Sequence, residues 1–422
     1  MKTILKVLDF GVNRFRHLVL FTVLLTLGYV VFSPFTISVD GFSYLKSSEV
    51  LFSDDFAKYY TWIREPGYPL FVRFFEDVGG LLLVFLVQGV FISFGVLAVI
   101  WATYKLMKIT SVSWRSFASS GLAVILVGGY ASTILQQATL VALFGLLMVV
   151  IARVVSKREL DWLSALLVFL LLLLSTLTAV FLGLAFGLAL FATLVFSGVL
   201  KPKLLLTYSA LASLGLVLVM IPWTQIKSSQ APEGAPDSLA IGAGTATQIA
   251  SNFDPVKEFY ELAQTQAALL NLGGEFPPSS GLGLANENRI FGSPTYSPEH
   301  SCGRFLTGVE PDELWGPIET SYRDRCVPLQ TLSVISMVNR LSNVFYPITG
   351  LALLITLFMS LRFVPNLRPV ILPAFLVLSP YLFLDASISR YGALIIPLGC
   401  ILLVELIHPK RFLGSQTAQP NP

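Results

Sequence analysis

Residues 80–104 read GLLLVFLVQGVFISFGVLAVIWATY and contain no charged side chain. A helix needs about 18 apolar residues to cross a bilayer, so this run predicts a membrane-spanning helix. The rest of the chain has the same character, because 55% of its 422 residues are hydrophobic and only 13% are charged. The mean hydropathy is +0.75, and a soluble globular protein has about 25% charged residues. The composition therefore predicts a polytopic membrane protein.

Further apolar runs approach or exceed the same length, which predicts an all-α membrane protein with about ten transmembrane helices. The expected spans lie near 17–34, 80–104, 116–134, 138–153, 161–177, 179–198, 204–224, 337–361, 368–384 and 391–408. The first run follows a basic N-terminal tail, as in a signal peptide, but no small-residue cleavage site follows it. We therefore interpret it as a retained span.

Lysine and arginine concentrate in alternate connections, and this asymmetry predicts the orientation. After the basic tail they occur at Lys105, Lys108, Arg115, Arg153, Lys157, Arg158, Lys201, Lys203, Arg362, Arg368, Lys410 and Arg411. The opposite short connections, near 135–137 and 178, contain none. Cytoplasmic connections carry the excess of basic residues in membrane proteins. We expect both termini in the cytoplasm and segments 35–79, about 225–335 and 385–390 on the outer face.

This topology divides the chain into an N-terminal membrane module (1–224), an outside loop domain (225–335), C-terminal membrane helices (336–408) and a cytoplasmic tail (409–422). The outside loops contain no N-x-Ser/Thr sequence, which favours the inner membrane of a bacterium. The net charge of +3 is spread over the ends of the spans, so it does not indicate a nucleic-acid partner.

In the outside loop domain, Cys302 and Cys326 either form a disulfide, as an oxidising compartment would allow, or stay unpaired. The chain has no Cys/His spacing typical of a metal site. Asp254-Pro255, the apolar positions that follow and the stop at Gly273-Gly274 predict one amphipathic helix in this loop.

The segment between the first two spans carries most of the polar chemistry. It contains the carboxylates Asp40, Glu49, Asp54 and Asp55, then Arg64, Glu65 and a Pro-Gly turn. Two short interfacial helices are expected here. The first has Asp40 as its N-cap, Tyr44, Val50 and Leu51 toward the membrane, and Lys46 among the headgroups. The second begins after Pro66-Gly67 and presents the apolar residues Tyr68, Leu70, Phe71, Phe74 and Phe75.

Asp40, Tyr44 and the run Arg64-Glu65-Pro66-Gly67-Tyr68-Pro69-Leu70-Phe71 resemble the first outside loop of the GT-C glycosyltransferases. These membrane enzymes use polyprenyl-phosphate sugars and include the protein O-mannosyltransferases and the lipid A aminoarabinose transferase. Ser389-Arg390-Tyr391, with Pro397 in the last span, is similar to a late R-Y…P segment of the family. Many members carry an acid near the outer end of the third or fourth span, where this chain has Gln136 and Gln137.

The resemblance implies an inverting transferase that moves a sugar from a polyprenyl-phosphate donor to a glycan, lipid or protein acceptor on the outer face. It implies Asp40 as the general base and Arg64 and Arg390 as contacts to the leaving phosphate. Tyr44, Tyr68 and Tyr391 would also contact substrate. Asp54 or Asp55 would bind the acceptor or a divalent cation, and whether a cation is used stays open.

Each of these residues also has a plainer interpretation. Asp40 is then a helix cap, Asp54-Asp55 a solvated loop, Arg64-Glu65 a surface charge pair, and Arg390-Tyr391 an interfacial anchor. Gln136-Gln137 either forms the polar tip of a helical hairpin or lines the site.

Two other functions compete. A polysaccharide polymerase or O-antigen-ligase-type enzyme would use the late outside loop, where His300, Arg304, Arg323 and Arg325 are candidates. A transporter of lipid-linked sugars would place ionisable residues inside its spans, and the predicted spans contain almost none.

Overall fold

The computed structural model describes residues 15–32, 39–54, 65–109, 112–132, 134, 136–157, 162–178, 180–196, 368–378 and 392–406, with isolated helical residues within 206–226 and 355–359. Several predicted features lie outside these residues: Asp55, Arg64, Arg390, Tyr391, Cys302, Cys326, His300, Arg304, Arg323, Arg325 and the helix predicted after Asp254.

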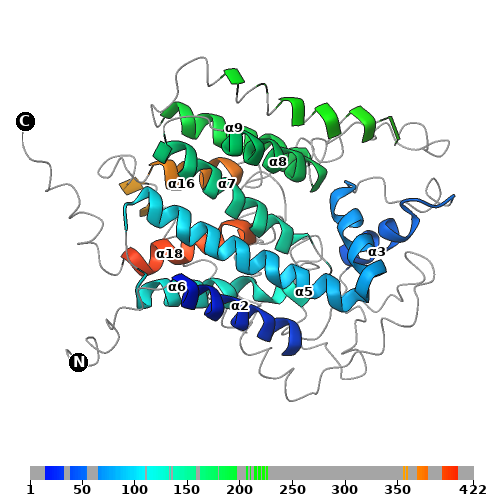
Figure 1. Ribbon diagram of the computed structural model, residues 1–422, viewed down its shortest axis with the longest axis horizontal. Helices are drawn as coiled ribbons and strands as arrows, with labels where there is room; N and C mark the ends of the chain where they lie inside the picture. Colours follow the sequence, from blue (N-terminus) through cyan, green and yellow to red (C-terminus); the bar gives the residue numbers. More distant parts are fainter. Residues whose placement is uncertain are drawn as a thin grey trace, which may run out of the picture.

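The elements follow in chain order as α2 (Phe15–Phe32), α3 (Val39–Val50), α5 (Gly67–Leu106), α6 (Trp114–Val127), η1 (Gly128–Ser132), α7 (Gln137–Lys157), α8 (Trp162–Thr178), α9 (Val180–Phe196), α16 (Arg368–Leu378), η7 (Gly392–Ile395) and α18 (Ile396–Leu406). One hydrophobic cluster contains buried residues from all of them. Figure 1 shows the helices packed side by side, with α3 against one end of α5.

The prediction of an all-α fold is confirmed for the described residues, which form helices and no strand. Within them, α5 and α7 are long and apolar enough to cross a membrane. Helices α2, α6, α8, α9, α16 and α18 overlap other predicted spans, and that they cross a membrane stays a prediction.

Helix α5 is longer than the predicted span because it includes the short helix expected after Pro66-Gly67. The φ of 70° at Gly80 lies in the left-handed region, and Gly79 is also non-helical, so the chain bends between two helical segments. In a straight helix, Tyr68 and Gln88 would lie about 30 Å apart. Instead the Tyr68 hydroxyl donates a hydrogen bond to Oε1 of Gln88. The segment 67–78 therefore folds back onto the segment that follows the bend.

Helices α5 and α7 form the most extensive helix contact among the described elements. Two glycines meet at their crossing, where a Cβ added to Gly145 would lie 2.8 Å from the Cα of Gly95. Small residues allow such close backbone approach between membrane helices. The α5–α7 crossing therefore depends on the absence of side chains at these two positions.

Replacing Gly145 with alanine is expected to lower the free energy of unfolding by about 1–3 kcal/mol, because the two backbones must separate. Gly187→Ala in α9 is the matched control, since the nearest atom to its added Cβ is 3.7 Å away. Both variants gain the same helix propensity, which favours alanine by roughly 0.5–1 kcal/mol. Thermal unfolding in detergent measures the difference, and equal stability of the two variants would contradict the tight crossing.

Candidate functional site

The predicted interfacial segment forms a buried aromatic and amide cluster at one end of the bundle. Tyr44 of α3 is 3% exposed and Tyr68 at the start of α5 is 1% exposed. Their rings meet edge to face with centroids 4.8 Å apart. Nε2 of Gln88, whose Oε1 accepts from Tyr68, donates to the carbonyl oxygens of Tyr130 at 3.4 Å and Ala131 at 3.2 Å. We call this end of the bundle, where α3, the start of α5 and η1 meet, the Tyr68 end.

The orientation predicted for α3 is partly wrong. Tyr44, Val50 and Leu51 were expected to face the membrane, but all three are buried inside the protein. Val50 and Leu51 pack against Trp223, in a cluster that also includes Leu70. The physical reason is that α3 packs against α5, and Val50 and Leu51 pack against Trp223, far along the chain; a helix-face pattern reveals neither contact.

The helix expected at Asp40 is present, but it begins one residue earlier, at Val39, so the prediction that Asp40 is its N-cap is wrong. Asp40 thus lies in the first turn of α3, where a carboxylate interacts favourably with the helix dipole. Asp54 follows the end of the same helix and is exposed. The structure therefore places Asp40 in the first turn of a short helix and Asp54 beyond its other end, with Tyr44 between them against Tyr68.

Gln136 and Gln137 were expected to form the polar tip of a hairpin, but they are 6% and 0% exposed. The burial arises because the start of α7 lies beside η1 and α7 also contacts η7. The element η7 directly follows Arg390-Tyr391 in the chain, at the beginning of the last predicted span. Helix α7 therefore contacts the residues with which that span begins. The start of α7 thus belongs to the Tyr68 end, together with η1.

A cavity of about 510 Å³ lies beside the predicted interfacial segment. Its lining combines residues that follow α3, residues at the start of α5, the second half of α8 and described helical residues within 206–226: Leu51, Phe52, Ser53, Pro66, Leu70, Leu173, Leu177, Leu218, Val219, Pro222, Trp223 and Ile226. Apart from Ser53 and Trp223, the residues that line the cavity have purely hydrocarbon side chains. The volume falls within the roughly 300–1,000 Å³ of ligand pockets.

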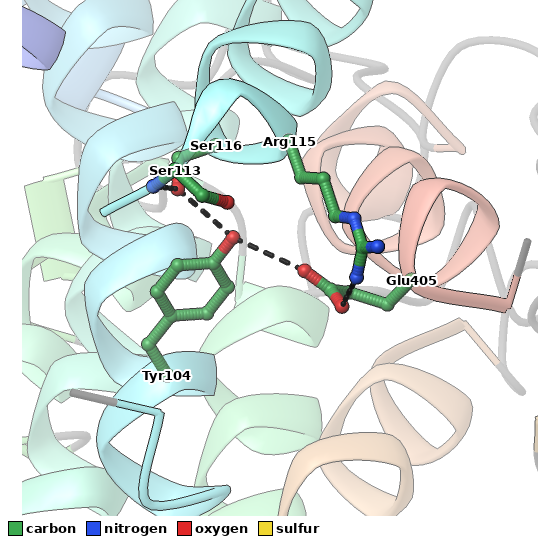
Figure 2. A network of polar contacts seen from close by, with 5 residues as sticks. All are labelled: Tyr104, Ser113, Arg115, Ser116 and Glu405. Atoms are coloured by element: carbon green, nitrogen blue, oxygen red, sulfur yellow. Dashed lines mark hydrogen bonds and ion pairs between the residues drawn. The ribbon is translucent and has the colours of Figure 1, made fainter. Parts of the chain in front are cut away.

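A second polar cluster lies at the opposite end of α5 and includes a buried charge. Glu405 of α18 is 1% exposed, and its Oε1 accepts a hydrogen bond of 3.3 Å from the Tyr104 hydroxyl. Nη1 of Arg115 lies 3.6 Å from Oε2 of Glu405. Ser116 donates to the Tyr104 oxygen at 3.0 Å, and the N–H of Ser113 donates to Ser116 (Figure 2). We call this the Glu405 end.

Sequence reasoning missed the Glu405 cluster, although one signal was present. Glu405 is the sole charged residue between Tyr391 and Leu406, within the last predicted span. An ionisable residue inside an apolar helix needs a partner. The sequence alone does not indicate that this partner is Arg115 at the start of α6.

Within the described part of the chain, no three His, Cys, Asp or Glu residues gather to hold a metal ion. Asp55, Arg64, Arg390 and Tyr391 are outside that part, so their predicted roles and the use of a divalent cation stay predictions. Comparison with protein-family models, curated proteins and solved structures finds no match to this chain.

Proposed function

We propose that the chain is a membrane glycosyltransferase that moves a sugar from a polyprenyl-phosphate donor to an acceptor on the outer face of a bacterial inner membrane. The apolar cavity beside the segment that carries Asp40 is the observation that supports this most strongly. A polyprenyl chain is a hydrocarbon, so it would gain free energy by entering such a lining. Two residues of the segment that resembles the GT-C loop line the cavity: Ser53, between Tyr44 and Arg64, and Pro66, within the run 64–71.

In the proposed reaction, an acceptor hydroxyl attacks the anomeric carbon of the sugar. The bond between that carbon and the phosphate oxygen breaks, and polyprenyl phosphate leaves with the bonding electrons. The carboxylate of Asp40 takes the hydroxyl proton as general base. Arg64 and Arg390 stabilise the negative charge on the leaving phosphate. The Tyr44–Tyr68–Gln88 cluster has a positioning role, because it fixes α3 against α5.

Filling the cavity is expected to weaken the use of long-chain donors. Leu218 lines the cavity and is 51% exposed, so tryptophan can replace it without opening the core. Leu218→Trp should raise KM for a polyprenyl-phosphate sugar roughly tenfold with kcat little changed, because about two or more buried methylene groups lose their contact. A donor with a two-isoprenoid chain should be affected less.

Leu188→Trp in α9 is the matched control for this experiment. Leu188 is 55% exposed and lies off the cavity. Equal KM values for the two variants with the long-chain donor would show that the cavity does not receive the lipid.

A transporter of lipid-linked sugars is the second candidate, favoured by the buried Glu405–Arg115 pair. Ionisable residues inside membrane segments often mark transport pathways. Glu405→Gln separates the two functions: it should stop the movement of a labelled lipid-linked sugar across proteoliposomes if the chain is a transporter. A transferase should retain sugar transfer in this variant, because Glu405 lies at the opposite end of α5 from the Tyr68 cluster.

A further inference from the structure

The first turn of α7 contains buried polar atoms that have no partner. The N–H of Leu140 donates to the carbonyl of Gln136 at 2.9 Å, so Gln136 caps the helix and Gln137 is its first residue. Gln137 is 0% exposed, and neither Nε2 nor Oε1 of its amide has a hydrogen-bond partner in the structure that surrounds it. The buried Oγ1 of Thr139 also lacks a partner there.

Such a turn is unfavourable for stability alone. Buried polar groups in native proteins are almost always hydrogen-bonded, and an orphaned one requires an explanation. A leucine would fill the space of Gln137 without the cost of burying an amide. An orphaned amide and an orphaned hydroxyl in one turn therefore indicate that this turn binds a polar ligand.

The geometry of a helix start indicates the charge of that ligand. Cα–Cβ bonds tilt toward the helix N-terminus, so the Cα–Cβ bond of Gln137 points toward the N-terminal end of α7. The first N–H groups of a helix have no intrahelical partner, and the helix dipole is positive at this end. These N–H groups, the amide NH₂ of Gln137 and the hydroxyl of Thr139 are all donors. Together they suit an anion with several acceptor oxygens, such as a phosphate.

The position of this turn fits a lipid-linked phosphate better than a soluble one. It follows η1, whose carbonyls at Tyr130 and Ala131 bind Gln88 of the Tyr68 cluster. Thr139 is partly exposed, so the turn is not sealed inside the core. The apolar cavity borders the same cluster through Pro66 and Leu70, on either side of Tyr68.

We propose that the first turn of α7 binds the phosphate group of a lipid phosphate, with Nε2 of Gln137 and Oγ1 of Thr139 as donors. This assignment rests on the proposed function, in which the same phosphate leaves with the polyprenyl chain. It adds two neutral donors that act on the phosphate beside the predicted arginines.

Binding to the purified full-length protein in detergent tests the site without turnover. The probes are farnesyl phosphate, inorganic phosphate and farnesol, which lacks the phosphate. Gln137→Leu should weaken farnesyl phosphate at least about tenfold, since a hydrogen bond to a charged group is lost, and should leave farnesol unchanged. The unfolding midpoint of unliganded Gln137→Leu should equal or exceed that of the wild type. Thr139→Val should weaken farnesyl phosphate independently.

Ser119→Ala is the control variant, because Ser119 of α6 is another buried hydroxyl without a partner in the described structure. Its farnesyl phosphate affinity should equal that of the wild type. Equal affinity in Gln137→Leu, or no binding of either phosphate by the wild type, overturns the site. If inorganic phosphate binds as tightly as farnesyl phosphate, the proposal that the bound phosphate belongs to a lipid is overturned. A wild type that binds farnesyl phosphate through Gln137 but transfers no sugar overturns the proposed function and leaves this site standing.

Discussion

Replacing Asp40 with asparagine is expected to lower sugar transfer by roughly 10²- to 10⁴-fold, because an amide cannot take the proton of the acceptor hydroxyl. The substitution keeps the size and hydrogen-bonding shape of the side chain. Asp40 lies in the first turn of α3, and the loss of a carboxylate there costs about 0.3–1 kcal/mol of helix stabilisation. The unfolding midpoint should therefore change little while kcat falls.

Asp77→Asn is the matched control for Asp40→Asn. Asp77 is an exposed acid of α5 that pairs with Arg73 at 2.9 Å one helical turn away. Such exposed pairs contribute about 0–1 kcal/mol, so activity and stability should both stay near the wild type. Activity that survives in Asp40→Asn would remove Asp40 from the mechanism, and an equal loss in both variants would indicate a general charge effect.

Replacing Arg115 with methionine is expected to lower the free energy of unfolding by about 3–5 kcal/mol. The carboxylate of Glu405 would then stay buried with the Tyr104 hydroxyl at 3.3 Å and no positive charge beside it. The side chain of Arg115 is only 14% exposed, so solvent does not replace the lost charge well. Chemical or thermal unfolding in detergent measures the loss.

The double variant Arg115→Met/Glu405→Leu should recover most of that stability, since an apolar pair of similar volume often replaces a buried ion pair without loss. Arg73→Met is the control, because its pair with Asp77 is exposed and should contribute about 1 kcal/mol or less. A double variant as unstable as Arg115→Met alone would show that the cost comes from lost packing by the arginine.

The helices of the N-terminal module could be predicted because their signals are local. Uninterrupted apolar runs gave the ranges of α2, α7, α8 and α9 to within a few residues, whereas α6 ends at Val127, seven residues before the predicted span 116–134 does. Pro66-Gly67 marked the start of α5, and the polar residues around Asp40 marked the start of α3. Composition and hydrophobic period determine such starts and lengths without reference to the rest of the chain.

The bend of α5 and the direction in which α3 packs could not be predicted in the same way. The apolar run predicts a span at 80–104 but not the bend at Gly79-Gly80. The contact between Tyr68 and Gln88 shows that segment 67–78 folds back. Tyr44, Val50 and Leu51 form an apolar face, and the sequence does not say whether lipid or protein covers it. The covering residues Tyr68 and Trp223 are 24 and more than 170 positions away along the chain.

The candidate site was predicted only in part, for the same reason. Local motifs in the first outside segment were enough to select its acidic and aromatic residues as candidates. The cavity joins this segment to Leu177 of α8 and to Trp223, and the Glu405 pair joins α18 to α6. These groupings depend on long-range packing, which no spacing within one segment encodes.

The proposed glycosyltransferase activity is tested most directly by the transfer reaction itself. Purified full-length protein in lipid nanodiscs would receive a set of labelled polyprenyl-phosphate sugars together with glycan, lipid and protein acceptors from a bacterial envelope. If the chain is this transferase, at least one donor releases polyprenyl phosphate, its label appears on an acceptor, and Asp40→Asn stops both. A folded wild type that consumes no donor, or an Asp40→Asn variant that consumes donor as fast as the wild type, would contradict it.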